Sequence, residues 1–182
     1  MKRITTLVLF SLSMLFAAVS VQAATVTLTS TLDGTDPGQP TSSTATGTGL
    51  MSYDTVTNLF DLSINVSGLT KTTLTNSHIH LGGSGANGPV IFGLGAGSSA
   101  NWTSTSTGIS LSVTGQTFPT ANIADLLAGK TYLNLHTAAF PGGEIRGQLV
   151  AAPVPVPAAA WLLGSGLIGL MGVASRKKAA RS

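Results

Sequence analysis

The sequence has no cysteine, few charged residues and few aromatic residues. Without cysteine, neither a disulfide framework nor a thiolate metal site can form, so the fold must be held by its hydrophobic core. Charged side chains make up only 8% of the chain and glycine contributes 22 residues, which favours short strands and turns over helices. The 182 residues allow one domain of about 100–200 residues with processing segments attached. We therefore expect one all-β domain.

The basic residues are concentrated at the two ends of the chain. Residues 24–150 contain three basic side chains, Lys71, Lys130 and Arg146, against six acidic ones, which gives this part a net charge of −3. A mildly acidic domain lacks the positive surface that attracts the phosphate backbone of nucleic acids. We therefore expect no nucleic acid partner.

The first 23 residues are typical of a secretory signal peptide. Lys2 and Arg3 precede an apolar run over residues 7–19, and residues 21–23 supply small side chains at the positions that a signal peptidase reads. The apolar run is too short for a typical membrane-spanning helix. We expect signal peptidase to remove this helix and leave an exported domain over residues 24–150.

After residue 150 the composition changes to a proline-containing linker, an uncharged apolar run over residues 158–174 and a basic end. This run of 17 residues lies at the short end of the roughly 17–25 residues that span a bilayer. The basic residues behind it are expected to stay on the cytoplasmic side. Residues 151–182 therefore predict a linker, a transmembrane helix and a basic tail that anchor the exported precursor in the membrane.

This C-terminal segment resembles the PEP-CTERM sorting signal of Gram-negative bacteria, in which a proline motif, an apolar helix and a basic cluster follow one another. The resemblance is carried by Val154, Pro155, Pro157, Arg176, Lys177 and Lys178. It implies recognition by an exosortase, removal of the helix, and export to the cell surface or to the extracellular polysaccharide matrix of a biofilm. One departure is Val156, which stands where the name-giving Pro-Glu-Pro motif has glutamate.

Alternation of apolar and polar residues predicts strands over residues 25–32, 49–53, 59–66, 73–81, 90–94, 108–113, 131–137 and 144–149. Residues 120–127 predict one short helical turn that stops before Gly129. Residues 33–47 predict a loop, where Asp33 and Asp36 are more typical of turns than of a calcium site. Together these segments predict a single antiparallel β-sandwich or Greek-key barrel of about seven to nine strands.

The three histidines of the chain lie on two of the predicted strands. Side chains repeat every second residue along a strand, so His78 and His80 share one face. His136 lies on the polar face of another strand. Three imidazoles with one open position suit Zn²⁺ or Cu²⁺, and Glu144 is a candidate fourth ligand or orienting partner.

The same residues also allow a purely structural interpretation. In it the imidazoles hydrogen-bond with Asn134, Glu144 or loop backbone, and Arg146 forms an ion pair with Glu144. The sequence favours this interpretation, because a His-X-His pair is a weak signal and the spacing does not place His136 beside it. We therefore expect no resident cofactor, with zinc or copper as the alternative.

No sequence motif indicates a catalytic site. Three histidines are fewer than copper/zinc superoxide dismutase chemistry needs, and a nucleophile elbow is missing. Residues 83–88 fit the spacing of a dinucleotide-binding loop, but Pro89 and an apolar strand follow where a phosphate-binding helix should begin. We expect a protein that is not an enzyme.

Residues 25–150 resemble the CHRD family, named after the repeated domain of chordin. The motifs that carry this resemblance are His78-Ile-His80, Gly85-Ala-Asn-Gly-Pro89, Leu126-Leu-Ala-Gly129, Tyr132-Leu-Asn-Leu-His136-Thr and Pro141-Gly-Gly-Glu-Ile-Arg-Gly-Gln148. The resemblance supplies no activity that can be carried over. We therefore predict an exported interaction protein of the cell surface or matrix that contacts polysaccharide or matrix proteins, and, as the alternative, a periplasmic or surface domain that binds copper or zinc.

Overall fold

The computed structural model describes residues 25–97 and 99–153. The predicted signal helix, the predicted transmembrane helix and the sorting residues Val154, Pro155, Pro157, Arg176, Lys177 and Lys178 lie outside the described residues. Within the described ranges, no helix combines the length and the apolar character needed to cross a membrane.

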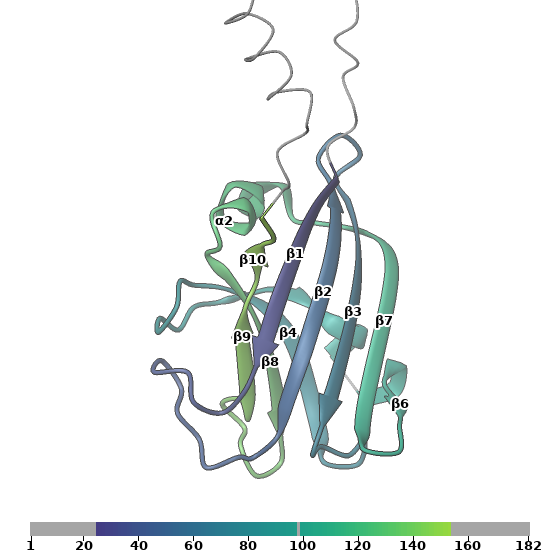
Figure 1. The fold of residues 1–182 in the computed structure, drawn as a ribbon, viewed down its shortest axis with the longest axis vertical. Helices are drawn as coiled ribbons and strands as arrows, with labels where there is room; N and C mark the ends of the chain where they lie inside the picture. Colours follow the sequence, from purple (N-terminus) through teal and green to yellow (C-terminus); the bar gives the residue numbers. More distant parts are fainter. Residues whose placement is uncertain (1–24, 98, 154–182) are drawn as a thin grey trace, which may run out of the picture. The chain divides into compact units, whose positions relative to one another are not determined.

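The described chain folds into two antiparallel sheets (Figure 1). The first has the strand order β10 (Val150–Ala151), β1 (Thr25–Leu32), β2 (Thr46–Asp54), β3 (Leu59–Ser67), β7 (Gly108–Thr117) and β6 (Thr103–Ser104). The second has the order β5 (Val90–Gly93), β4 (Leu74–Leu81), β8 (Thr131–Thr137) and β9 (Ile145–Gln148). The expected all-β fold is thus confirmed.

Of the two expected architectures, the β-sandwich is observed and the closed barrel is not. Strands β1 and β9 lie close to each other. The backbone pairing next to them is one isolated bridge between Asp33 and Arg146, not a continuous ladder. Continuous pairing between the edge strands is what closes a barrel, so the described residues form two sheets instead.

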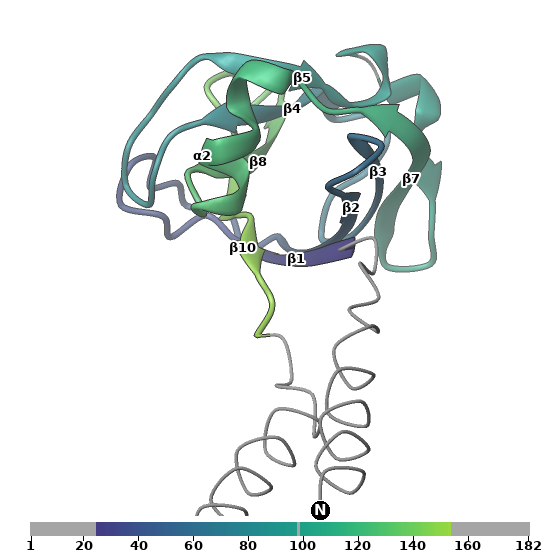
Figure 2. The ribbon, with the colours of Figure 1, turned by 90° about the horizontal axis from the view of Figure 1, so that it is seen from above.

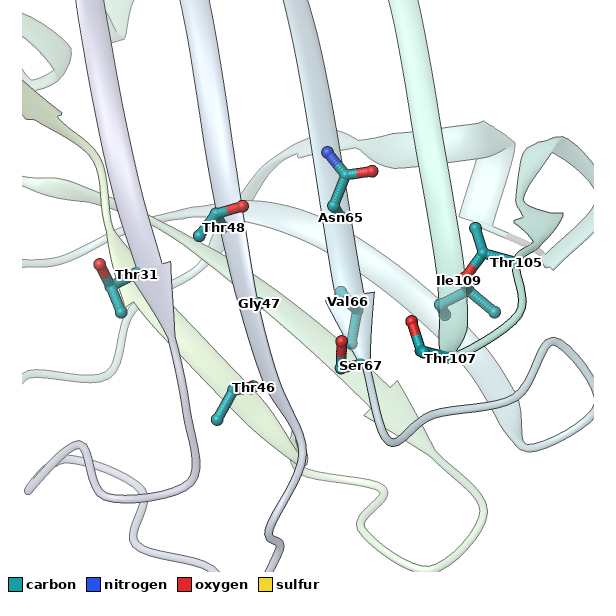
Figure 3. A pocket seen from close by; sticks show the side chains of 10 residues that line it. All are labelled: Thr31, Thr46, Gly47, Thr48, Asn65, Val66, Ser67, Thr105, Thr107 and Ile109. Carbon is teal, nitrogen blue, oxygen red and sulfur yellow. The ribbon is translucent and has the colours of Figure 1, made fainter.

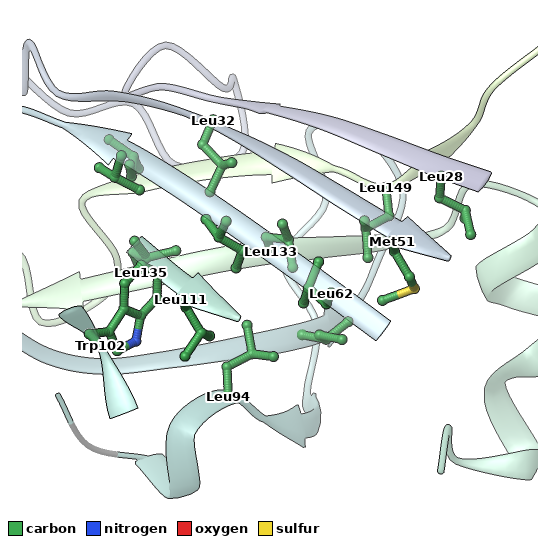
Figure 4. Close-up of a cluster of buried hydrophobic side chains, with 14 of the residues drawn as sticks. Leu28, Leu32, Met51, Leu62, Leu94, Trp102, Leu111, Leu133, Leu135 and Leu149 are labelled. Carbon is green, nitrogen blue, oxygen red and sulfur yellow. The ribbon is translucent and has the colours of Figure 1, made fainter. Parts of the chain in front are cut away.

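The core lies between the two sheets and is built from the apolar side of each alternating strand (Figure 4). Leu28 and Leu62 of the first sheet face Leu133 and Leu135 of the second, and all four are at most 1% exposed. The predicted bounds of β1 and β8 are confirmed. Exposed and buried residues alternate along β1, whereas β8 is covered on both faces. The sequence did not predict the two-residue strands β6 and β10.

Short helical segments occur between the strands. They are the 3-10 helices η2 (Leu94–Gly97), η3 (Ser99–Asn101) and η4 (Thr120–Asn122) and the α-helix α2 (Ile123–Leu127). The predicted turn over residues 120–127 is confirmed as η4 followed by α2, and Gly129 adopts a φ of 68° past its end. Helix α2 lies at the end of the sandwich near β10 (Figure 2).

Two loops project side by side beyond β9, and both views show them together (Figures 1 and 2). We refer to them as loop 33–45, after β1, and loop 82–89, between β4 and β5. The Asn87 side chain donates a hydrogen bond of 2.9 Å to the Gly38 carbonyl oxygen. A Cβ atom on Gly38 would lie 2.7 Å from the Gly85 carbonyl, so glycine allows this close approach.

Candidate metal site

The pairing of β4 with β8 brings the three histidines together on the outer face of the second sheet. His78 lies opposite Asn134, and His136 lies opposite Asn76, two pairs further along and therefore on the same face. The three imidazoles can each offer one nitrogen such that all three nitrogens lie within 4.8 Å of one another. We call these residues the histidine cluster.

Backbone carbonyls fix the protonation pattern of two of these imidazoles. The Nδ1 atoms of His80 and His136 lie 2.9 Å from the carbonyl oxygens of Gly88 and Pro141. A carbonyl oxygen can only accept, so each Nδ1 carries the hydrogen and the Nε2 of the neutral ring keeps a lone pair. Metal-binding histidines usually have this arrangement, in which the second ring nitrogen donates to a carbonyl or carboxylate.

The nitrogens that carry the lone pairs point into the cluster. His80 is 8% exposed, and its buried Nε2 has no hydrogen-bond partner. The Nε2 of His136 accepts a hydrogen bond of 3.3 Å from Nδ1 of His78, and a metal ion would have to replace this hydrogen bond. Two nitrogens bound to one tetrahedral Zn²⁺ are separated by about 3.3–3.4 Å when each Zn–N bond is about 2.0–2.1 Å. The third nitrogen, within 4.8 Å, needs to approach by at most about 1.4 Å to complete the set.

Burial keeps the imidazoles of β4 neutral at physiological pH. Desolvation, followed by the neighbouring His136 and His80, lowers the pKa of His78 to about 4. Desolvation is also the largest cause that lowers the pKa of His80, with smaller contributions from His136 and Arg146. Since only a neutral imidazole can bind a metal ion, these pKa shifts leave the lone pairs available at pH 7.

A stack of side chains supports His80 from the side of β9. The ring of Tyr132 is stacked on His80 with centroids 5.0 Å apart. The Cζ atom of Arg146 lies 3.6 Å from the Tyr132 ring centroid. Because β8 lies between β4 and β9, the order of the stack is His80, Tyr132 and then Arg146.

Arg146 also holds the two loops over this face. Its guanidinium donates to the Asn87 side chain at 2.9 Å and to the carbonyl oxygens of Ala86 and Gly83 at 3.0 and 3.3 Å. Its Nε lies 3.3 Å from a carboxylate oxygen of Asp36. Loop 82–89 is thereby fixed in the position where Gly88 accepts from His80. The other Asp36 oxygen accepts from the Gly38 backbone N–H, so this residue acts in a turn and in an ion pair.

The expected ion pair between Arg146 and Glu144 is therefore wrong, and Glu144 lies outside the histidine cluster. One Glu144 carboxylate oxygen accepts from the Ser43 hydroxyl at 2.7 Å, and the other accepts from the Thr137 hydroxyl. Thr137 follows His136 directly, so its side chain points to the opposite face of β8. The structure thus brings together the three predicted histidines but places the predicted fourth ligand elsewhere.

The family model of the CHRD domain matches residues 28–149, about two thirds of the chain. The chain belongs to the CHRD domain family. The matched residues include β1 from Leu28 onward, all of the second sheet, both loops and the three histidines. No curated protein and no solved structure matches the chain.

The predicted hydrogen bonds from the histidines to loop backbone are confirmed for His80 and His136 of this CHRD domain, but the sequence did not identify which loop residues accept them. Gly88 and Pro141 act through backbone carbonyls, which have no residue-specific signal. Their positions in glycine- and proline-rich turns directly after the two histidine strands are the one available indication. Chemically, the CHRD domain presents three imidazole nitrogens on one face of a sheet, a donor set suited to Zn²⁺ or Cu²⁺.

Proposed function

We propose that this CHRD domain binds one transition metal ion, Zn²⁺ or Cu²⁺, through His78, His80 and His136. The observation that carries the proposal is the buried Nε2 of His80, which has no hydrogen-bond partner, in a ring whose centroid lies 5.5 Å from that of His78 and 5.9 Å from that of His136. A buried polar atom without a partner costs about 1–3 kcal/mol. A metal ion would offset this cost by using the lone pair.

A purely structural role explains less of the geometry. It accounts for the hydrogen bonds from His80 and His136 to backbone carbonyls. It does not account for the unpartnered Nε2 of His80, nor for the placement of His136 and His80 so close to His78 that they help to lower its pKa. The donor set leaves one position for an exchangeable ligand, which favours a carrier or binding site over a closed structural site.

The proposal places the domain outside the cytoplasm. Residues 1–23 support export by their signal peptide pattern, and residues 151–182 support a membrane-anchored precursor processed by an exosortase. Expression in a Gram-negative host with and without an exosortase tests this part. The mature domain should reach the surface only with the exosortase, and an unprocessed chain in both strains would contradict it.

Metal binding is tested on the full-length protein, purified in detergent and stripped with a chelator. After equilibrium dialysis against Zn²⁺ or Cu²⁺ near pH 7, elemental analysis should find one ion per chain. The variants His78→Ala and His136→Ala should lose the ion, whereas Asn65→Ala on the first sheet should retain it. A folded wild-type protein without stoichiometric metal would contradict the proposal.

A second candidate function is the surface or matrix interaction that the sequence favoured. Its support is a groove on the outer face of the first sheet (Figure 3). The polar residues that line this groove are Thr31, Thr46, Thr48, Asn65, Ser67, Thr105 and Thr107. No lining residue is charged, so the groove suits the hydroxyl groups of a neutral polysaccharide.

This candidate is tested by retention of the protein on purified extracellular polysaccharide. Asn65→Ala and Thr48→Val should weaken retention, and His78→Ala should leave it unchanged. The reverse pattern would contradict a role for the groove. The same variants therefore separate the two candidate functions.

A further inference from the structure

A pocket open to solvent lies beside the histidine cluster, and it reaches only two of the three imidazoles. Its lining residues are Thr75, Asn76, His78, His136, Thr137, Ala138 and Pro141. His80 does not line this pocket, and its Nε2 is buried. Small molecules can therefore approach the cluster from the side of His78 and His136, while His80 closes the opposite side.

The protein supplies three donors to the cluster and leaves a fourth position open. In the part of the chain that the structure describes, the group of possible ligands contains His78, His80 and His136 and no carboxylate. The nearest candidate in the sequence, Glu144, is bound to the hydroxyls of Ser43 and Thr137 instead. A metal with three protein ligands normally takes water or another exogenous ligand in its fourth position.

The charges around the pocket favour an anion in that position. Neutral imidazoles do not compensate the double positive charge of Zn²⁺ or Cu²⁺, so the complex keeps its full charge in a partly desolvated place. No acidic side chain lines the pocket. Asp36, an acidic residue of the loops on this face, is paired with Arg146. Glu144 lies behind the lining residue Thr137, and its carboxylate accepts hydrogen bonds from the Thr137 and Ser43 hydroxyls. No acidic side chain therefore forms part of the pocket wall itself.

We propose that the fourth coordination position of the bound metal opens into this pocket and takes up a small monodentate anion. This inference rests on the proposed metal-binding function and adds the class of ligand that completes the site. Because the position faces solvent, the anion exchanges without movement of the sheet or of loop 82–89.

The test is a titration of the Cu²⁺-loaded full-length protein, in detergent, with sodium azide. A new azide-to-copper charge-transfer band should appear and saturate at one azide per copper, with a matching change in the electron paramagnetic resonance spectrum. Ala138→Trp should fill the pocket and weaken azide binding by about tenfold, equal to about 1.4 kcal/mol. It should still bind one copper per chain.

Thr75→Trp fills the pocket from β4 and serves as a second variant if Ala138→Trp does not fold. Thr48→Trp, on the first sheet, is the matched control and should bind azide like the wild type. Copper-loaded protein whose spectra do not respond to azide would overturn the inference and leave the metal site intact. Unchanged azide affinity in both pocket variants would also overturn it. A protein that binds no copper would overturn the proposed function itself.

Discussion

The outer faces of the two sheets are both polar, yet they differ in what covers them. On the first sheet, Thr25, Thr27 and Thr29 of β1 are exposed to solvent. On the second sheet, Asn134 and Arg146 are only 2% and 3% exposed, because the two loops lie over them. The same alternation of residues therefore produces a hydrated face in one sheet and a desolvated one in the other.

This difference determines which polar side chains need a specific partner. Water satisfies an exposed threonine, whereas a covered polar group must find a partner inside the protein. Arg146 has partners in Asp36 and loop 82–89, although its Nε makes an ion pair and no hydrogen bond, and Oδ1 of Asn134 has no hydrogen-bond partner. The Nε2 of His80 has none either, and this makes the covered face the place where a ligand is expected. The following changes test how far the two faces differ.

The largest effect is expected for Arg146→Met. Loss of the guanidinium leaves Asp36 without its partner and removes the donors that hold loop 82–89. Breaking a buried ion pair typically costs about 3–5 kcal/mol, so we expect a loss near 3 kcal/mol in the free energy of unfolding by urea. Arg146→Lys keeps the charge and should lose less. A loss below about 1 kcal/mol in Arg146→Met would show that the loops do not depend on this residue.

Glu144→Gln should separate stability from metal binding. The uncharged amide weakens the hydrogen bonds from the Ser43 and Thr137 hydroxyls, so we expect a loss of about 1 kcal/mol in unfolding free energy. The number of metal ions per chain, measured by elemental analysis after dialysis, should stay the same. Loss of the metal in a folded Glu144→Gln protein would indicate that Glu144 is a metal ligand.

Lowering the pH should destabilise the metal-free protein, because His78 and His80 on the outer face of the second sheet have lowered pKa values. The pKa of His78 is about 4 in the folded state against 6.5 as its ordinary value. Between these values the unfolded chain binds a proton that the folded chain does not, so stability is lost as the pH falls from about 6.5 to about 4. The lowered pKa of His80 acts in the same direction.

This dependence is measured by urea unfolding at a series of pH values. His78→Gln should show a smaller loss of stability over the same range. Equal slopes in both proteins would contradict the assigned protonation of His78.

The smallest effect is expected on the first sheet. Thr29 is exposed on β1, and Thr29→Val keeps a β-branched side chain in the strand. The free energy of unfolding should change by less than about 0.5 kcal/mol. A loss of unfolding free energy as large as that of Glu144→Gln would contradict the expected difference between the outer faces of the two sheets.

Local patterns predicted the strands well and the contacts between them poorly. β1 and β8 have the predicted bounds. The shared face of His78 and His80 follows from the same period of two. The position of His136 beside them depends on the pairing of β4 with β8, which are far apart in the sequence. Alternation within one strand contains no information about its neighbour.

The wrong expectations concern residues at strand ends and in loops. Glu144 precedes β9 and follows Gly143, whose φ of 127° redirects the backbone, so the alternation of β9 does not fix its direction. The partner of Arg146 proved to be Asp36, in a loop whose path over the second sheet depends on the packing of Gly38 against Gly85. Such contacts follow from the tertiary structure and not from local sequence.

The most direct test of the metal site is the X-ray absorption spectrum of the full-length protein loaded with one equivalent of Zn²⁺. We predict three imidazole ligands with Zn–N distances of about 2.0–2.1 Å and one further light ligand. The imidazole contribution should decrease in His136→Ala. A spectrum with oxygen ligands alone, from folded wild-type protein, would contradict a site built from His78, His80 and His136.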